Sequence, residues 1–236
     1  MVELKNKKLL VVSPHPDDEV IGCGGLIQKI KQSGGAVYVL FLTVGTTQDF
    51  NHHGVSTQDE RLQEIEAVSR FLEFNDWRIA FPGNDHHLRL DQIDQKKIVH
   101  EIERGDRISL EAIKPDILVF PDFTDYNQDH LAAAQATYIA CRPALNTDKF
   151  IPPFILSYKT PMNLWSLQEP GRVNFLVGLT PEIVERKLQA LNLYATQTRS
   201  DGHLRSNRTL KALAILHGSL DGKLFAEGFY SHKLIS

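Results

Sequence analysis

Residues 13–25 read SPHPDDEVIGCGG and directly follow the apolar run LLVV at residues 9–12. The apolar run predicts a buried strand, and the apolar spacing that comes after the acids predicts a helix. Three acidic residues, Asp17, Asp18 and Glu19, lie between these two predicted elements. Because neighbouring negative charges repel each other, the folded protein must supply a group that compensates them.

Strand and helix patterns alternate along the first half of the chain. Strands are predicted over residues 7–13, 36–44, 77–81 and 116–121, and those over 36–44 and 116–121 have the apolar character of buried strands. Helices are predicted over residues 20–33, 57–74, 91–103 and 129–141. Thr57 and Glu60 have the spacing of a capping box, which marks the start of the second helix. This alternation is typical of a parallel sheet covered by helices.

The second half is less regular. Strands are predicted over residues 154–158, 173–179 and 225–234. Helices are predicted from Thr180-Pro181 to about Tyr194, and over residues 207–217 with a stop at Gly218. Since no repeat or linker interrupts the pattern, we expect an α/β fold with a parallel, doubly wound sheet covered by helices on both faces. We expect one domain over residues 1–236.

Composition excludes several classes of protein. The chain has 236 residues, of which 42% are hydrophobic, and a formal net charge of −3. Lys and Arg do not gather into a stripe, which disfavours nucleic-acid binding, and no apolar run is long enough to span a bilayer. The two cysteines, Cys23 and Cys141, disfavour a disulfide framework and a thiolate-rich zinc site. We therefore expect a cytoplasmic protein that binds neither nucleic acid nor membrane.

The acidic stretch reads best as part of a metal site. In open parallel sheets ligands bind beyond the carboxyl ends of the strands, and His15, Asp17 and Asp18 follow the first predicted strand directly. His15 and Asp18 are of the types that bind zinc, and Asp17 is then free to take a proton from a bound water. The simpler alternative is that the two aspartates only cap the following helix.

A dinucleotide-binding loop is a further alternative for this stretch. Gly22, Gly24 and Gly25 follow the strand, but Ile27 occupies the third glycine position of the fingerprint. The preceding acids also repel a pyrophosphate. We expect these glycines to permit close packing between helix and sheet.

A catalytic zinc needs a third protein ligand. The strand DILVFP is followed by DFTDYNQDH at residues 122–130, which places His130 beyond the end of another strand. If the two strands are neighbours, His130 faces the first loop, and Asp129 is placed to orient a partner group. The alternative is that Asp125, Asn127 or Asp129 caps the helix and that His130 lies on the surface.

Several segments together resemble one known family. PHPDDE followed by NQDH resembles the LmbE-like, or PIG-L, family of zinc-dependent N-deacetylases. DERLQEIEAVSRFL is similar to the family's first long helix, with Arg61 and Glu64 at its Arg-x-x-Glu positions. KLQALNLYATQ at residues 187–197 and FAEGF at residues 225–229 are similar to two later segments and come in the family's order.

The resemblance implies a Rossmann-like fold and a set of roles. His15, Asp18 and His130 would bind zinc, with ferrous iron or another divalent metal as the alternative. Asp17 would be the general base that activates zinc-bound water, and Arg61 would bind substrate. The implied substrate is a small N-acetylated amino sugar or conjugate, and the implied assembly is a homo-oligomer.

One position departs from the family. Many members carry His-x-Asp-His where this chain has Asn127-Gln128-Asp129-His130. Asn127 can donate a hydrogen bond to an oxyanion but cannot carry a proton at neutral pH, which leaves Asp17 for both transfers unless another histidine substitutes. The candidates are His52-His53 and His86-His87, for which solvated loop positions are the alternative.

Two rival functions stay open at this stage. One is an amidase that acts on another N-acyl compound, such as a thiol conjugate. The other is a sugar- or nucleotide-binding protein without catalysis, which the departure at position 127 favours.

Three further side chains have two readings each. Tyr194 is expected in the core rather than at the substrate, and Glu227 is expected to pair with backbone or with an arginine. Trp165 either stacks on a sugar or packs against the core.

Overall fold

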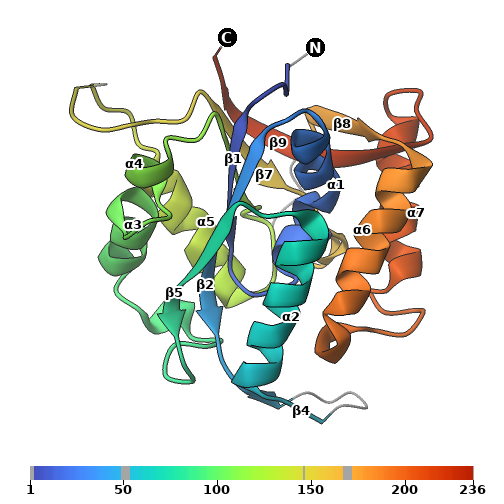
Figure 1. The fold of residues 1–236 in the computed structure, drawn as a ribbon, viewed down its shortest axis with the longest axis horizontal. Coiled ribbons are helices and arrows are strands. Elements are labelled where there is room, and N and C mark those ends of the chain that lie inside the picture. Colours follow the sequence, from blue (N-terminus) through green and yellow to red (C-terminus); the bar gives the residue numbers. More distant parts are fainter. Residues whose placement is uncertain (1–2, 49–53, 146, 167–171, 236) are drawn as a thin grey trace.

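The computed structural model describes residues 3–48, 54–145, 147–166 and 172–235, and a seven-stranded sheet forms its centre (Figure 1). The order across the sheet is β5-β2-β1-β6-β7-β9-β8. The strands are β1 (Lys8–Ser13), β2 (Ala36–Val44), β5 (Asp76–Pro82), β6 (Ile117–Pro121), β7 (Phe154–Tyr158), β8 (Phe175–Leu179) and β9 (Phe225–Leu234). The short strands β3 (Thr47–Gln48) and β4 (Val55–Ser56) pair separately.

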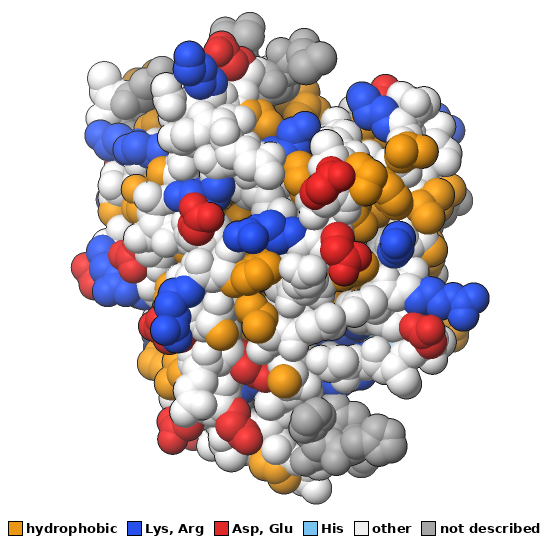
Figure 2. Space-filling view, turned by 45° about the vertical axis from the view of Figure 1, so that its right-hand side comes forward, with side chains coloured by type: hydrophobic (Ala, Val, Ile, Leu, Met, Phe, Trp, Pro, Cys, Tyr) orange, Lys and Arg blue, Asp and Glu red, His pale blue; other side chains and the backbone are white. Residues whose placement is uncertain are grey.

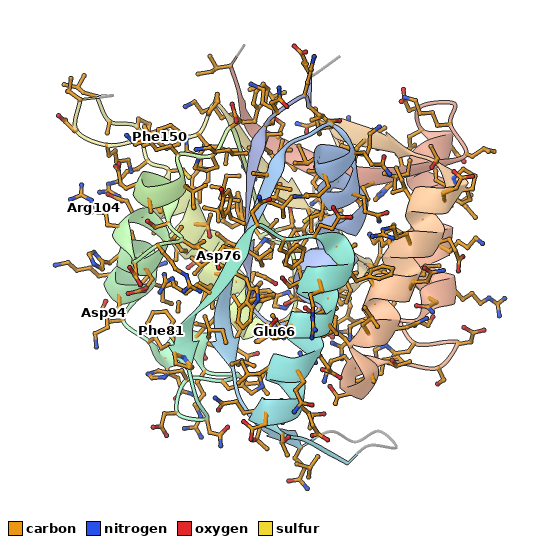
Figure 3. All side chains as sticks on the ribbon, in the orientation of Figure 1. Glu66, Asp76, Phe81, Asp94, Arg104 and Phe150 are labelled. Carbon is orange, nitrogen blue, oxygen red and sulfur yellow. The ribbon has the colours of Figure 1, made fainter. Side chains whose placement is uncertain are left out.

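Helices cover both faces of the sheet, as the sequence predicts. The helices are α1 (Asp18–Gln32), α2 (Gln58–Leu72), α3 (Gln95–Arg104), α4 (Leu110–Ile113), α5 (Gln128–Ala140), α6 (Pro181–Leu193) and α7 (Asn207–Ser219). In Figure 1, α3, α4 and α5 lie on one side of the sheet, and α1, α2, α6 and α7 lie on the other. The side chains in Figure 3 fill the space between these layers. Two apolar clusters, one on each face, form the core.

The sheet is not parallel throughout, which corrects the prediction in one place. Strands β5, β2, β1, β6 and β7 are parallel, but β9 runs antiparallel to both β7 and β8. A single crossover helix returns the chain to the end of the sheet at which the preceding strand began, so the next strand runs parallel to that strand. Between β8 and β9 the chain passes through two helices, α6 and α7, which bring it back to the edge where β8 ended.

The predicted helix boundaries hold with small shifts. Thr57 and Glu60 form the expected capping box of α2. The helix predicted within residues 91–103 is α3, which starts at Gln95 after its Asp94 cap. Helix α7 runs through Gly218 to Ser219, so the predicted stop is wrong. A Cβ at Gly218 would lie 2.6 Å from the Lys223 carbonyl oxygen, which shows that the glycine admits the returning chain.

Helix α1 is bent, and side chains from the C-terminal part of the sequence form hydrogen bonds with its backbone near the bend. Cys23 has non-helical angles (φ −145°, ψ 22°) inside α1. The Glu227 carboxylate accepts hydrogen bonds from the backbone N–H groups of Gly25 and Leu26, both at 2.7 Å. Lys187 donates to the Ile21 carbonyl at 2.8 Å and to Glu227 at 2.7 Å. Glu227 therefore partners backbone as predicted, but its cation is a lysine.

The glycines of α1 permit close packing, as expected. A Cβ at Gly22 would lie 2.4 Å from the Tyr158 ring, and one at Gly25 would lie 2.7 Å from Leu179. Tyr158 and Leu179 belong to β7 and β8, so these two glycines set how closely α1 approaches the sheet.

Charged side chains of both signs are interspersed on the face of the molecule that Figure 2 shows, without a stripe of one sign. Among the described residues, no helix combines the length and the apolar character that a membrane crossing requires.

Replacement of Glu227 by Gln is expected to destabilise the protein by about 3 kcal/mol, because it leaves Lys187 as an unpaired buried charge. The free energy of unfolding, measured by urea titration, tests this. Glu185→Gln, at an exposed position of α6, is the matched control and is expected to change stability by less than about 0.5 kcal/mol. Equal stability of both variants would refute the role of the Lys187–Glu227 pair.

Candidate metal centre

The candidate site lies where the winding of the sheet changes direction. Strand β1 pairs with β2 on one side and with β6 on the other, and all three run parallel. The loop after β1 carries His15, and the loop after β6 leads into α5, which carries His130. The two strands are therefore neighbours, as the sequence argument required, and their carboxyl ends bring the two histidines together.

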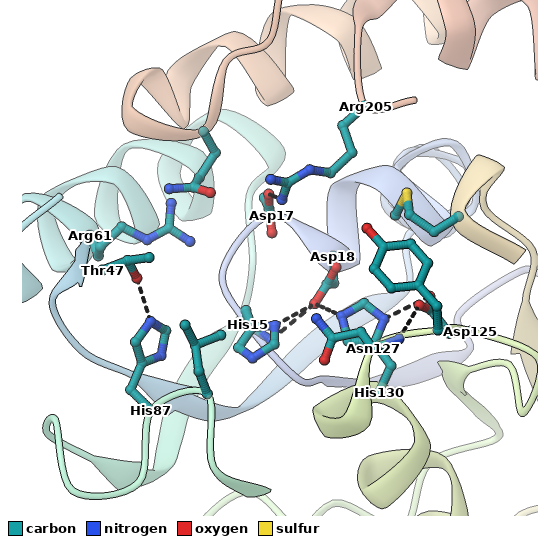
Figure 4. Close-up of a pocket in the computed structure, with 14 residues that line it drawn as sticks. His15, Asp17, Asp18, Thr47, Arg61, His87, Asp125, Asn127, His130 and Arg205 are labelled. Atoms are coloured by element: carbon teal, nitrogen blue, oxygen red, sulfur yellow. Dashed lines mark hydrogen bonds and ion pairs between the residues drawn. The ribbon is translucent and has the colours of Figure 1, made fainter. Parts of the chain in front are cut away.

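Three side chains converge on one point (Figure 4). The Asp18 Oδ2 lies 3.1 Å from His130 Nε2 and 3.4 Å from His15 Nδ1. One ligand atom from each residue lies within 4.8 Å of the other two. Ligand atoms around a tetrahedral zinc with bonds of about 2.0–2.1 Å are about 3.3 Å apart. Two imidazole nitrogens and a carboxylate oxygen at these spacings fit a divalent cation such as zinc.

A carboxylate holds the outer nitrogen of each imidazole. Asp129 Oδ2 lies 2.8 Å from His15 Nε2, and Asp125 Oδ2 lies 2.9 Å from His130 Nδ1. The other Asp129 oxygen accepts the backbone N–H of Leu90 at 2.9 Å. Such contacts orient the rings so that the inner nitrogens face the shared point, as carboxylates do behind metal-bound histidines. The sequence placed Asp129 near this role and missed Asp125.

Burial and charge shape the protonation of the three converging groups. Burial by itself lowers the pKa of both histidines, but their aspartate partners raise the pKa of His15 and raise that of His130 well above its usual value. Burial also acts to raise the pKa of Asp18, yet the charge and hydrogen bonds of His130 and His15 lower it overall. Without a metal, the raised pKa values favour the protonated forms of the two histidines, whose positive charges compensate Asp18.

The other two acids of the stretch have separate partners. Burial raises the pKa of Asp17, while the nearby Arg205 charge acts to lower it, and Asp17 Oδ2 lies 3.1 Å from Arg205 Nη1. Burial raises the pKa of Glu19 to about 8. The Tyr194 hydroxyl donates to Glu19 at 2.6 Å, which confirms that Tyr194 lies in the core. Three adjacent acids thus have three different environments.

The alternative that these residues only cap helices is wrong for Asp17 in the first loop. In the second loop a side chain does cap the helix, but His130 does not lie on the surface. Asp17 occupies the cap position of α1 in a left-handed conformation (φ 115°) without a side-chain capping bond. Asn127 does cap α5, since its Oδ1 accepts the Asp129 N–H at 2.9 Å. His130 is nevertheless only 4% exposed. Because Oδ1 serves the helix, the amide nitrogen of Asn127 is the end that remains for the pocket.

Arg61 lines the pocket, but its guanidinium already donates three hydrogen bonds to other groups of the protein. Its Nη1 donates to Glu64 at 3.1 Å and to Thr196 at 3.2 Å, and its Nη2 donates to the Pro16 carbonyl oxygen. Arg61 therefore holds the loop that carries His15 and Asp17.

A pocket of about 200 Å³ lies in front of the cluster. Its lining includes seven residues that were not assigned to the site from the sequence: Thr47, Leu88, Asp125, Tyr126, Met162, Gln197 and Arg205. Of the histidines proposed as substitutes for position 127, His87 lines the pocket, and its Nε2 lies 2.6 Å from Thr47 Oγ1. Burial lowers the pKa of His87 to about 4, so this imidazole is neutral at pH 7. His52 and His53 lie outside the described residues.

The family model of GlcNAc-PI de-N-acetylase, PIG-L, matches residues 10–141, which is more than half of the chain and includes both loops of the site. This chain belongs to the PIG-L family. Diacetylchitobiose deacetylase of Thermococcus kodakarensis is 27% identical over 229 residues, covering 94% of this chain and 82% of the relative.

Solved structures show the same PIG-L fold at lower identity. N,N'-diacetylchitobiose deacetylase of Pyrococcus horikoshii has a TM-score of 0.70 and 23% identity, covering 97% of this chain and 86% of that one. GalB of Pseudomonas putida, a 4-carboxy-2-hydroxymuconate hydratase, has a TM-score of 0.74 and 20% identity, covering 98% of both chains. Because the second protein is a hydratase, the fold alone does not identify the reaction.

Asp125→Asn is expected to weaken zinc binding about tenfold to hundredfold, because the amide no longer compensates and orients the His130 ring. Competition against a chromogenic chelator measures the zinc affinity. Asp148→Asn, at an exposed position, is the control and is expected to bind zinc like the parent. If Asp125→Asn bound zinc as tightly as the control, Asp125 would have no part in holding the metal.

Zinc binding is expected to release protons, because the pKa values of His15 and His130 are raised and a metal needs their neutral forms. Proton release makes the apparent affinity increase with pH, by about tenfold per pH unit for each proton displaced. Calorimetry of the metal-free protein in buffers with different ionisation enthalpies counts the protons. A pH-independent affinity with no release would contradict this electrostatic account.

Proposed function

We propose that this chain is a metal-dependent hydrolase that removes the acetyl group from an N-acetylated amino sugar or one of its conjugates. The observation that carries the proposal is the convergence of His15, Asp18 and His130, with a carboxylate behind each imidazole, at a pocket that Asp17 also lines. The deacetylases among the relatives support the choice of reaction. We propose that residues 1–236 form a single domain of this type.

We propose zinc as the metal, held by His15, Asp18 and His130. Two imidazoles and one carboxylate leave a coordination position open, which is the usual arrangement of a catalytic zinc site. Ferrous iron is the main alternative, since it is bound by the same set of ligands. When bound, the cation lowers the pKa of a coordinated water and polarises the amide carbonyl.

The protein's own groups would move the protons and stabilise charge. Asp17 would take a proton from the attacking water and return it to the leaving amine. The Asn127 amide would donate a hydrogen bond to the oxygen that becomes negatively charged. His87 is neutral at pH 7 and hydrogen-bonded to Thr47, so we assign both proton transfers to Asp17.

Two of the assigned residues would act by positioning. Asp129 would hold His15 in the orientation that metal binding needs. Arg61 would contribute to substrate binding mainly through the loop that it fixes, because three of its five N–H donors are bonded to Pro16, Glu64 and Thr196.

Two other functions share these features. One is an amidase that cleaves another N-acyl compound, such as a thiol conjugate. The other is a binding protein without turnover, and the asparagine at position 127 favours it because many family members have histidine there.

A panel of substrates separates the three functions. Amine release is measured with zinc-loaded protein on N-acetylglucosamine, N,N'-diacetylchitobiose and an N-acylated thiol conjugate. We expect release from the amino sugars. Release only from the thiol conjugate would favour the amidase. Binding without release from any compound would favour the non-catalytic protein and overturn the proposal.

Asp17→Asn is expected to keep zinc binding but to lower kcat by about a hundredfold or more, because an amide cannot accept the proton. Asparagine tolerates the left-handed backbone of position 17, so the loop is expected to keep its shape. The measurements are kcat on the best substrate and zinc content by elemental analysis. Asp201→Asn, on an exposed loop, is the control. Full activity of Asp17→Asn would remove Asp17 from the mechanism.

A further inference from the structure

An apolar cleft opens beside the metal pocket. Its apolar walls, which define the cleft below, are Phe123, Tyr126, Leu131, Leu164 and Trp165. The cleft has a volume of about 760 Å³, against about 200 Å³ for the metal pocket. Phe123 and Tyr126 lie in the loop after β6, and Leu164 and Trp165 follow β7, the next strand of the sheet. The same edge of the sheet therefore builds both cavities.

Three large apolar side chains in the walls of the cleft are exposed to solvent. Tyr126 is 56% exposed, Leu164 is 71% exposed and Trp165 is 75% exposed. The reading of Trp165 as a core residue is therefore wrong. Large apolar side chains that gather at one exposed place, next to a polar pocket, are typical of a binding site.

The cleft adjoins the metal pocket. Asp125 and Tyr126 line both cavities, and Asp125 also holds the Nδ1 of His130. A group bound in the cleft therefore lies one side chain away from the candidate metal ligands. A molecule with an acetylated sugar in the small pocket has its remaining part directed into the cleft or into solvent.

We propose that the cleft binds an apolar alkyl or aryl group attached to the amino sugar. This inference rests on the proposed deacetylase function and narrows its substrate class. The five wall residues offer carbon surface and ring faces. The two other lining residues are Asp125, whose carboxylate is already committed to His130, and Ser166. A second sugar ring needs several polar partners for its hydroxyl groups, which this lining supplies less well than it supplies apolar contact.

A series of glycosides tests the proposal by activity. The substrates are the methyl, butyl and hexyl glycosides of N-acetylglucosamine. We expect kcat/KM to increase with chain length, by at least about tenfold from methyl to hexyl, because each methylene transfers from water into the cleft. Leu164→Ser is expected to lower the ratio of hexyl to methyl kcat/KM by about tenfold. Leu224→Ser, at a position that is 72% exposed and not part of the cleft lining, is the matched control.

Tryptophan fluorescence tests the same contact without catalysis. The chain has two tryptophans, and Trp77 packs against Phe41 while Trp165 is exposed in the cleft wall. In the Asp17→Asn background, the hexyl glycoside is expected to shift the emission to shorter wavelength and to protect it from acrylamide. Trp165→Phe is expected to abolish this shift, and Leu164→Ser is expected to raise the glycoside concentration that it requires.

The outcomes distinguish this inference from the proposed function. A fluorescence shift without hydrolysis of any glycoside would support the cleft and overturn the deacetylase. Hydrolysis with no dependence on chain length and no effect of Leu164→Ser would overturn the cleft alone. A higher kcat/KM for N,N'-diacetylchitobiose than for the hexyl glycoside, lowered by Leu164→Ser, would replace the apolar group by a second sugar. A dimer that Leu164→Ser dissociates in sedimentation would replace it by a second copy of this chain.

Discussion

The structure depends on how three consecutive buried acids are compensated at the end of β1. Asp18 lies between two imidazoles, Asp17 pairs with Arg205, and burial raises the pKa of Glu19 to about 8 beside the Tyr194 hydroxyl. These partners come from α5, from the segment before α7 and from the end of α6. The neutral form of Glu19 and the separate cation for Asp17 remove most of the mutual repulsion. What remains at Asp18 is one carboxylate between two histidines, the three residues that we propose as metal ligands.

The bend in α1 links this site to the last strand. Helix α1 must place Asp18 at the pocket and also pack its glycines against β7 and β8, and the break at Cys23 permits both. Just after the break, the Glu227 carboxylate of β9 accepts hydrogen bonds from the N–H groups of Gly25 and Leu26. Strand β9 reaches this position because it enters the sheet between β7 and β8. The C-terminal part of the chain therefore supports the N-terminal loop of the candidate site.

Position 127 illustrates how one side chain serves structure and chemistry together. The Asn127 oxygen caps α5, which begins at Gln128, one residue before Asp129 and two before His130. The cap thus fixes the placement of both residues, and the amide nitrogen remains as a hydrogen-bond donor for the pocket. A histidine at this position would add a proton carrier. In this chain the third histidine of the pocket, besides His15 and His130, is His87, which comes from a different loop and is hydrogen-bonded to Thr47.

The sequence by itself determined the alternation of strands and helices, the two loops at the strand ends and the identity of the three converging residues. These follow from local spacing and from the rule that parallel strands end at one edge. Only the tertiary structure decided that β9 is antiparallel, that Asp125 and Arg205 belong to the site, and that Trp165 is exposed beside the pocket. Each of these depends on contacts between segments far apart in the chain, or on the path of connecting loops. Long-range contacts and loop paths leave no periodic signal in the sequence, because periodicity records only which side of a helix or strand is buried.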